Sequence, residues 1–315
     1  MTPPSSVRAG TDRPDDAART RTGVTYGLVA YGLWGIFPLY FRLLEDSGAV
    51  EILIHRILWS LLLCTLLMLA LHRFGRLRAT LTDRRAVTWL GLAAVVIAVN
   101  WGVYIFAVNS GHVIEASLGY FINPLVTVLL GVVLLRDRLR PAQWTALGIG
   151  TPAVVVLTVD YGRPPVISLI LAFSFGTYGL CKNRVGGSVD ALTGLTTETL
   201  LLAPVGVVDL AWIEGSGRGT FTQNAPWQGL LLASCGIVTV APLLLFAASA
   251  ARVPLSMIGL LQYVTPTLQF LCGVFVLGEQ MPLVRWVSFC FVWLAVLLLV
   301  LDAVRTPRAR RAGRA

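Results

Sequence analysis

Two short polar segments stand out in a chain that is otherwise strongly apolar, "GYFINPLVT" at residues 119–127 and "LQYVTPTLQ" at residues 261–269. Each carries three polar side chains at intervals of three and four residues: Tyr120, Asn123 and Thr127 in the first, and Gln262, Thr265 and Gln269 in the second. On a helix this spacing places each set on one face. Such a face either lines a cavity or hydrogen-bonds neighbouring membrane helices, at about 0.6 kcal/mol per contact. We interpret both faces as walls of a polar cavity.

A proline lies at the matching point of each segment, Pro124 in the first and Pro266 in the second. Proline removes a backbone donor and kinks or breaks a helix. Broken helices often form the binding sites of membrane transporters. We therefore predict a helix break near both prolines.

Three charged residues lie within or at the ends of apolar runs, namely Arg56, Glu115 and Glu198. A charge at the centre of a bilayer costs about 2.5–3.5 kcal/mol on insertion scales, so each should face a cavity or a partner. Arg56 either contacts an anionic substrate or a gate, or it is a structural side chain that snorkels or pairs with Glu115. Glu198 lies 142 residues after Arg56, which is the offset of the internal duplication described below. The two residues are nevertheless expected at different depths in the membrane, which argues against an ion pair between them. Glu198 and Glu115 are candidates for proton coupling, and structural hydrogen bonding is the alternative.

Further aromatic and amide side chains fall at helical spacing in other apolar runs. Tyr31 and Trp34 share one face of the first run, and Asn100 and Tyr104 lie one turn apart in the third. Their positions favour either packing between helices or contact with a substrate. We include all four in the predicted cavity.

The sequence contains no motif for catalysis or metal binding. HExxH, GxSxG and CxxC are absent, and the five cysteines lie singly in apolar runs. We therefore expect no enzyme activity, no metal site, no cofactor and no disulfide framework. The net charge of +9 is spread between apolar runs and at the termini, which argues against nucleic acid as a partner.

The composition places these residues in a membrane protein. Apolar residues make up 56% of the chain and charged residues 13%, about half the charged fraction of an ordinary globular domain. Runs of about 20 apolar residues, the length that crosses a bilayer, occur ten times: 24–43, 52–72, 87–109, 113–134, 142–159, 164–183, 191–213, 227–250, 255–277 and 282–302. We predict an all-α polytopic membrane protein with ten transmembrane helices.

Lysine and arginine predict the orientation. With both termini in the cytoplasm, twenty of the 25 basic residues fall on the inner side and four on the outer side. This positive-inside bias predicts a multi-pass protein of the cytoplasmic membrane with cytoplasmic N- and C-termini. Residues 1–22 are polar and are expected to be disordered in the cytoplasm, and residues 304–315 form a basic cytoplasmic tail.

The chain is internally duplicated at an offset of 142 residues. The offset aligns several residues that are not generic to apolar helices: Pro124 with Pro266, Asp137 with Glu279, Trp144 with Trp286, and Asp160 with Asp302. Residues 23–160 and 161–303 are then two five-helix repeats. Because five is odd, the second repeat crosses the membrane in the opposite sense, an arrangement typical of secondary transporters.

The segments "YGLWGIFPLYFRLL", "NWGVYIFAVNSGHVIEASLGYFINP" and "DALTGLTTETLLLAP" resemble the RarD-type branch of the EamA family, in the drug/metabolite transporter superfamily. The resemblance covers residues 23 to 302. It implies two inverted five-helix repeats around a central cavity, to which residues 100–104, 119–124 and 261–266 contribute, Tyr263 among them.

The sequence therefore predicts a permease that moves a small organic metabolite or drug by alternating access, with proton coupling as a further expectation. A flippase for a lipid-linked intermediate is the main alternative, and a membrane-embedded enzyme is a weaker one. A flippase should open its polar face laterally to lipid, whereas a permease should enclose it. The expected partners are the bilayer and a small-molecule substrate, and a homodimer is a further expectation.

Overall fold

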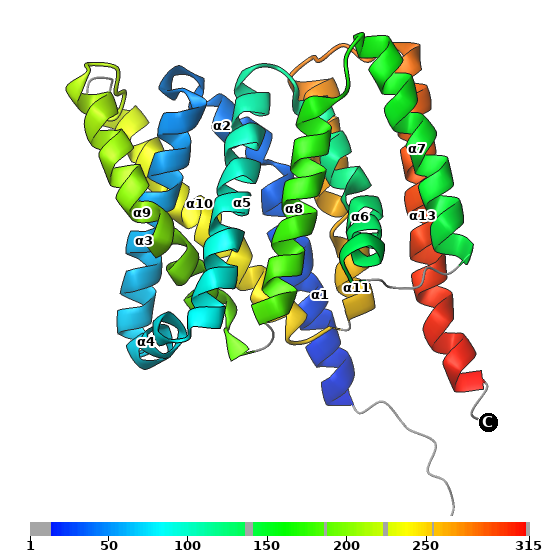
Figure 1. Ribbon diagram of the computed structural model, residues 1–315, viewed down its shortest axis with the longest axis horizontal. Helices are drawn as coiled ribbons and strands as arrows, with labels where there is room; N and C mark the ends of the chain where they lie inside the picture. Colours follow the sequence, from blue (N-terminus) through cyan, green and yellow to red (C-terminus); the bar gives the residue numbers. More distant parts are fainter. Residues whose placement is uncertain (1–13, 136–140, 186–187, 223–225, 254, 313–315) are drawn as a thin grey trace, which may run out of the picture.

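Every regular element in the described part of the chain is a helix. The computed structural model describes residues 14–135, 141–185, 188–222, 226–253 and 255–312 (Figure 1). The elements in chain order are α1 Pro14–Gly35, α2 Phe37–Arg42, η1 Glu45–Ser47, α3 Ala49–Ala70, α4 Phe74–Thr82, α5 Arg84–Asn109, α6 Val113–Leu135, α7 Pro141–Tyr161, α8 Val166–Val185, α9 Ala191–Gly215, α10 Pro226–Ala250, α11 Leu255–Leu261, α12 Val264–Leu271, η3 Cys272–Val276 and α13 Leu283–Ala312.

Eight segments among the described residues are long and apolar enough to cross a bilayer, which makes this a multi-pass membrane protein. They correspond to eight of the ten predicted spans. The predicted spans at 113–134 and 142–159 are also helical, as α6 with 23 residues and α7 with 21. Side chains in parts of both helices lie outside the described residues.

The chain differs from the sequence prediction at its ends. α1 begins at Pro14, so residues 14–22 are helical where disorder was expected. Proline suits the first turn of a helix, because the backbone N–H that it lacks would have no partner within the helix there. α13 likewise continues through the predicted basic tail to Ala312. Residues 1–13 and 313–315 lie outside the described part.

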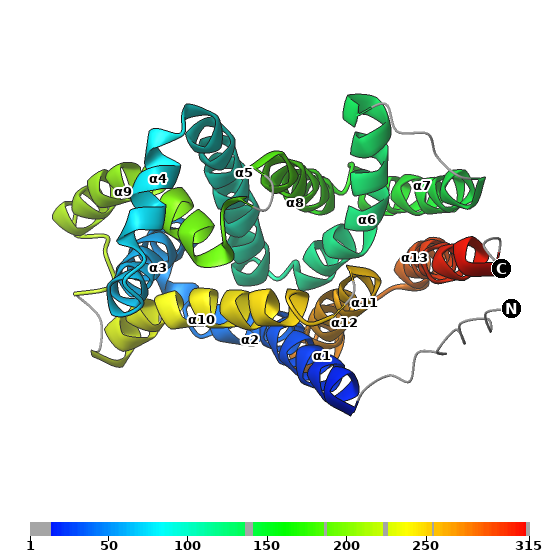
Figure 2. The same cartoon turned by 90° about the horizontal axis from the view of Figure 1, so that it is seen from below.

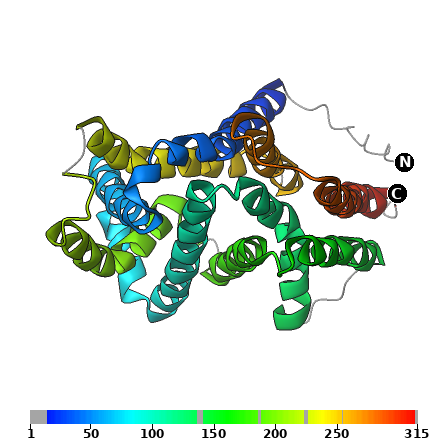
Figure 3. The ribbon, with the colours of Figure 1, turned by 90° about the horizontal axis from the view of Figure 1, so that it is seen from above.

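Helices from the two halves of the chain pack against each other throughout the molecule. α3 packs between α9 and α10, α8 packs on α5 and α6, and α1 packs on α10 and α12. α7 and α13 stand side by side at one end of the molecule, away from α4 and α9 at the other (Figure 2). The view from above also shows α7 (green) and α13 (red) at one end of the molecule and α9 at the other (Figure 3).

Two glycines allow helices to approach closely. A Cβ added at Gly119 of α6 would lie 2.8 Å from the Ser168 carbonyl of α8, and one at Gly236 of α10 would lie 2.6 Å from the Trp59 carbonyl of α3. In lipid there is no hydrophobic driving force between helices, so the close van der Waals packing that small residues allow stabilises such contacts instead.

The two faces of the bundle differ in what lies on them. α1 begins, α13 ends and α4 lies on the same face, which we call the terminal face; it is the lower side of Figure 1. The α5–α6, α7–α8 and α9–α10 connections lie on the opposite face. In a bilayer these two faces meet the two aqueous sides.

Candidate functional site

Arg56 is buried in the N-terminal half of α3, in a mostly aromatic setting. Its side chain is part of a residue only 4% exposed, and its Nε donates a hydrogen bond to Thr239 Oγ1 of α10 at 2.9 Å. The guanidinium carbon lies 4.1 Å from the centre of the Trp101 ring, and 5.5 and 5.6 Å from Phe37 and Phe41. Cation–π contacts of this kind stabilise a desolvated guanidinium by about 2 kcal/mol. Four helices, α2, α3, α5 and α10, thus contribute to one charged position.

A hydrogen-bonded amide on α5 lies beside this position. Asn100 Nδ2 donates to the Leu171 carbonyl at 3.0 Å and to Ser174 Oγ at 2.9 Å, both on α8. The Tyr120 hydroxyl of α6 donates to Asn100 Oδ1 at 3.0 Å. The Tyr104 ring lies 5.7 Å from the Tyr120 ring, and the Tyr104 hydroxyl is buried with no hydrogen-bond partner among the described residues. The predicted residues Asn100, Tyr104 and Tyr120 are therefore in one cluster.

Tyr31 and Trp34 lie in a second cluster, against the interrupted helix α11–α12. The two rings are 5.5 Å apart, and each is 5.9 Å from Phe246 of α10. The Thr265 hydroxyl donates to the Tyr31 carbonyl at 2.8 Å, and Gln269 Nε2 donates to the Trp34 carbonyl at 3.2 Å. Trp34 also packs against the hydrophobic core beside Arg56, so the two clusters are neighbours.

The helix breaks predicted near Pro124 and Pro266 have different outcomes in the structure. α6 continues without interruption through Pro124. The ninth span is divided into α11, α12 and the π-helix η3, and the first interruption falls at Gln262 and Tyr263, just before Pro266. Asn123 is 8% exposed, and its Oδ1 has no partner in the described part of the chain.

Glu198 lies in a separate pair toward the terminal face. Lys182 Nζ donates to Glu198 Oε1 at 2.7 Å, and the Tyr178 hydroxyl donates to Oε2 at 3.2 Å. The Glu198 side chain is 2% exposed and that of Lys182 is 31% exposed. Phe175 stands between Tyr178 and Tyr120, with ring centres 6.1 and 6.0 Å away. A line of aromatic rings thus connects the Glu198 pair to the cluster around Asn100.

Arg56 is not paired with either of the two glutamates considered from the sequence. Glu198 is held by Lys182, and Glu115 lies at the opposite face. Glu115 Oε1 accepts from the Ile167 backbone N–H at 3.1 Å, and Arg163 Nη2 lies 3.7 Å from Oε2. Glu115 thereby supplies an acceptor to the first turn of α8, where backbone donors have no partner within the helix.

Two more carboxylates at the opposite face connect the halves of the chain, and neither was identified from the sequence as a site residue. Glu51 Oε1 on α3 accepts from the backbone N–H groups of Thr220 at 2.7 Å and Phe221 at 3.2 Å, in the α9–α10 connection. Glu279 accepts from the first turn of α6, with Ile114 N at 2.9 Å. These contacts could not be predicted from the sequence, because their partners are backbone groups far along the chain.

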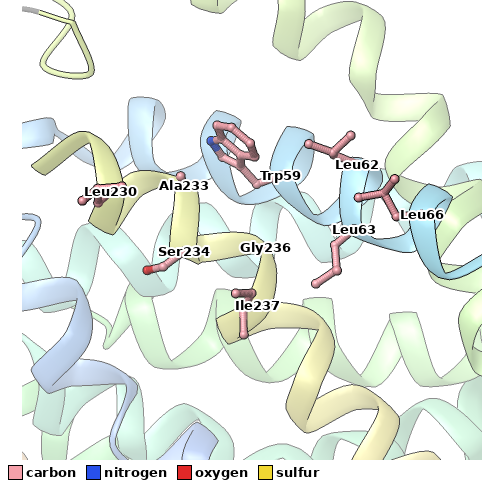
Figure 4. A pocket seen from close by; sticks show the side chains of 9 residues that line it. All are labelled: Trp59, Leu62, Leu63, Leu66, Leu230, Ala233, Ser234, Gly236 and Ile237. Carbon is pink, nitrogen blue, oxygen red and sulfur yellow. The ribbon is translucent and has the colours of Figure 1, made fainter. Parts of the chain in front are cut away.

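An apolar groove of about 340 Å³ lies on the surface between α3 and α10 (Figure 4). Its lining consists of Trp59, Leu62, Leu63, Leu66, Leu230, Ala233, Ser234, Gly236 and Ile237. Leu66 and Ile237 are 52% and 61% exposed, as expected for side chains that meet lipid. The groove contains none of the predicted polar site residues. Among the described residues no group of His, Cys, Asp and Glu has the arrangement of a metal site.

Comparison with known proteins gives matches over nearly the whole chain. A model of the EamA-like transporter family matches twice, at residues 21–159 and 165–301. Protein RarD of Streptomyces exfoliatus is 50% identical over 93% of this chain and 92% of its own length, and protein RarD of Escherichia coli K12 is 42% identical over 93% and 98%. An uncharacterized transporter of Bacillus subtilis, YojE, is 40% identical over 93% and 98%. A crystal structure at 18% identity matches with a TM-score of 0.59 over 90% of this chain and 98% of that one, which shows a shared fold.

Proposed function

The chain belongs to the RarD-type branch of the EamA-like transporter family, so it is a membrane transporter of the drug/metabolite superfamily. From this we propose that it is a secondary transporter that moves a small organic molecule by alternating access. The two matches of one family model to consecutive halves support two homologous repeats. Two repeats of five helices each would cross the membrane in opposite senses.

Helix packing supports this inverted repeat. An inverted repeat of five spans relates α1 to α8, α3 to α9, α5 to α10, α6 to α12 and α7 to α13. Under this exchange the contact between α5 and α8 corresponds to the contact between α10 and α1, and that between α6 and α8 corresponds to that between α12 and α1. Likewise α3–α10 becomes α9–α5, while α7–α13 and α3–α9 map onto themselves. All of these pairs are in contact in the described structure. A pseudo-twofold relation of this kind gives the bundle two arrangements of comparable energy, which alternating access requires.

The observation that carries the proposal is the enclosure of the polar residues. Asn100 and Arg56 are 1% and 4% exposed, and Tyr120 and Thr265 hydrogen-bond to other helices. The groove at the lipid-facing surface is apolar instead. A flippase should present its polar face to such a lateral opening, so the arrangement favours a permease for a small molecule over a lipid flippase. A relative in Pseudomonas aeruginosa, 34% identical over 92% of this chain, is named chloramphenicol-sensitive protein RarD, which fits a drug or metabolite as the solute.

The orientation and coupling follow from charge. We assign the terminal face to the cytoplasm, because the basic residues concentrate there. The opposite face is then external in this proposal. The hydrogen bonds of Glu51, Glu115 and Glu279 between the two halves of the chain support its assignment as the closed face. Glu198 is the candidate for proton coupling, because protonation would remove the charge that holds Lys182.

Cysteine labelling tests the cavity. In a cysteine-free protein, single cysteines at positions 120, 123, 262 and 265 should react with a water-soluble thiol reagent. Leu66→Cys is the matched control, since Leu66 is exposed but lies on the apolar groove and should stay unreactive. Uniform protection of the four positions in a folded protein would reject the transport route.

A further inference from the structure

Arg56 has more hydrogen-bond donors than the protein satisfies. A guanidinium carries five N–H donors, and Thr239 accepts from one of them. In the described part of the chain no other hydrogen bond to Arg56 forms and no carboxylate lies within 4.0 Å of it, although the residue is only 4% exposed. Ring contacts stabilise the charge, but they leave the in-plane donors without acceptors.

Tyr104 provides a second unsatisfied group at the same place. Its residue is 3% exposed, and its hydroxyl has no partner among the described residues. Tyr104 also lies within electrostatic reach of the Arg56 guanidinium. Buried polar groups are rarely left unpaired, because each lost hydrogen bond is costly. Both groups can donate, so a ligand that satisfies them must supply acceptor oxygens.

We propose that Arg56 and Tyr104 bind the carboxylate of a small organic monoanion, which names the substrate class of the proposed transporter and rests on that proposal. Trp101 covers one face of the guanidinium and Thr239 takes the Nε edge, so the remaining donors can meet a planar carboxylate in bidentate fashion. The other titratable groups near Arg56 are the hydroxyls of Tyr40 and Tyr120 and the thiol of Cys235.

The charge balance selects a monoanion. Among the described residues, the titratable groups that interact with Arg56 are tyrosine hydroxyls and a thiol, with no second cation. A phosphate dianion would therefore leave an uncompensated negative charge in a medium of low dielectric constant. The rings of Phe37 and Phe41, 5.5 and 5.6 Å from the guanidinium, suit an apolar or aromatic remainder of the ligand.

Matched probes test this site on the purified full-length protein. Thermal unfolding is followed with 3-phenylpropionate, its neutral amide 3-phenylpropionamide, and phenyl phosphate. The acid should stabilise the protein at concentrations about tenfold or more below those that the amide or the phosphate requires, since a bond to a charged group contributes that much. Arg56→Lys should weaken the response to the acid at least tenfold. Arg218→Lys is the control, because Arg218 is exposed, although its guanidinium also lies over a ring, that of Trp212.

Tyr104→Phe separates binding from folding. The hydroxyl bonds to nothing in the described structure, so its removal should leave the unfolding temperature of the free protein unchanged or raise it. The response to the acid should still fall several-fold. An equal response to acid and amide, no response to any probe, or an unchanged acid response in both variants overturns the proposal. The cysteine-labelling test needs no ligand, so a positive result there would confine such a failure to the substrate class.

Discussion

Glu51→Gln should loosen the opposite face of the bundle without removing an acceptor atom. In the wild type, Glu51 Oε1 accepts two backbone N–H groups, from Thr220 and Phe221, and the Thr220 hydroxyl lies 3.0 Å away. The residue is 4% exposed, so water does little to replace these contacts. Glutamine keeps the oxygen but loses the charge.

The expected size follows from the bond types. A hydrogen bond to a charged group contributes about 1.5–3 kcal/mol and a neutral one about 0.5–1.5 kcal/mol, so each of the two bonds loses about 1–1.5 kcal/mol. The closed arrangement then loses about 2–3 kcal/mol relative to one in which the α9–α10 connection has moved away. That difference raises the population of the open state about 30- to 150-fold.

Cys235 can report this opening. It is 1% exposed on α10, and its sulfur accepts a hydrogen bond from the Tyr40 hydroxyl at 3.2 Å, close to Arg56. In a protein that retains Cys235 alone, Glu51→Gln should increase labelling by a membrane-impermeant thiol reagent from the external side at least tenfold. Glu45→Gln is the matched control, because Glu45 is on the same face in an exposed pair with Arg42, with side chains 47% and 46% exposed. Equal labelling rates in the two variants would refute the reasoning, and a lower unfolding temperature without faster labelling would make Glu51 a structural strap only.

Three further outcomes follow from Glu198 and Asp190, two charged groups nearer the terminal face. Glu198→Gln should leave exchange across proteoliposomes intact and abolish uptake driven by an imposed pH gradient, and a retained response to the gradient would remove Glu198 from coupling. Burial acts to raise the pKa of Asp190, but hydrogen bonds from Thr193 and Arg76 outweigh burial, so the pKa is lowered. The stability that the Asp190 carboxylate contributes should therefore be complete above about pH 4 and should be lost as the pH falls through the lowered pKa. Asp190→Ala should cost about 1 kcal/mol of stability at pH 7 and Asp190→Asn less, since asparagine still caps α9; equal losses measured by thermal unfolding would contradict the capping role.

The positions of the long helices could be predicted because they depend on local composition. An apolar run of about 20 residues can satisfy its backbone in lipid only as a helix or a closed barrel. Shorter elements were missed for the same reason. The connection at 73–86 contains the helix α4, which buries only Leu77 and Thr80, too few residues for a clear apolar pattern.

The composition of the candidate site was only partly predictable. Arg56, Asn100, Tyr104 and Tyr120 were identified as polar residues in apolar runs, and the structure brings them together. The partner of Arg56 could not be identified, because Thr239 lies 183 residues away and no charge marks it. Lys182 is one of the twenty basic residues counted on the inner side when the orientation was predicted. Its contact with Glu198 appears only in the structure.

In the proposed inverted repeat the two halves have nearly symmetric backbones, so the side chains must determine which face is closed. At the opposite face, carboxylates that are mostly buried, such as Glu51 and Glu115, accept backbone N–H groups across the halves. At the terminal face, the halves are joined by Asp190 with Arg76 at 3.2 Å and Arg73 at 4.0 Å, and these side chains are 31–62% exposed. Exposed ion pairs contribute about 0–1 kcal/mol, less than buried bonds to a charged acceptor. The resting protein should therefore favour closure of the opposite face by a few kcal/mol, and only a substrate that binds the other arrangement more tightly by that amount can reverse it.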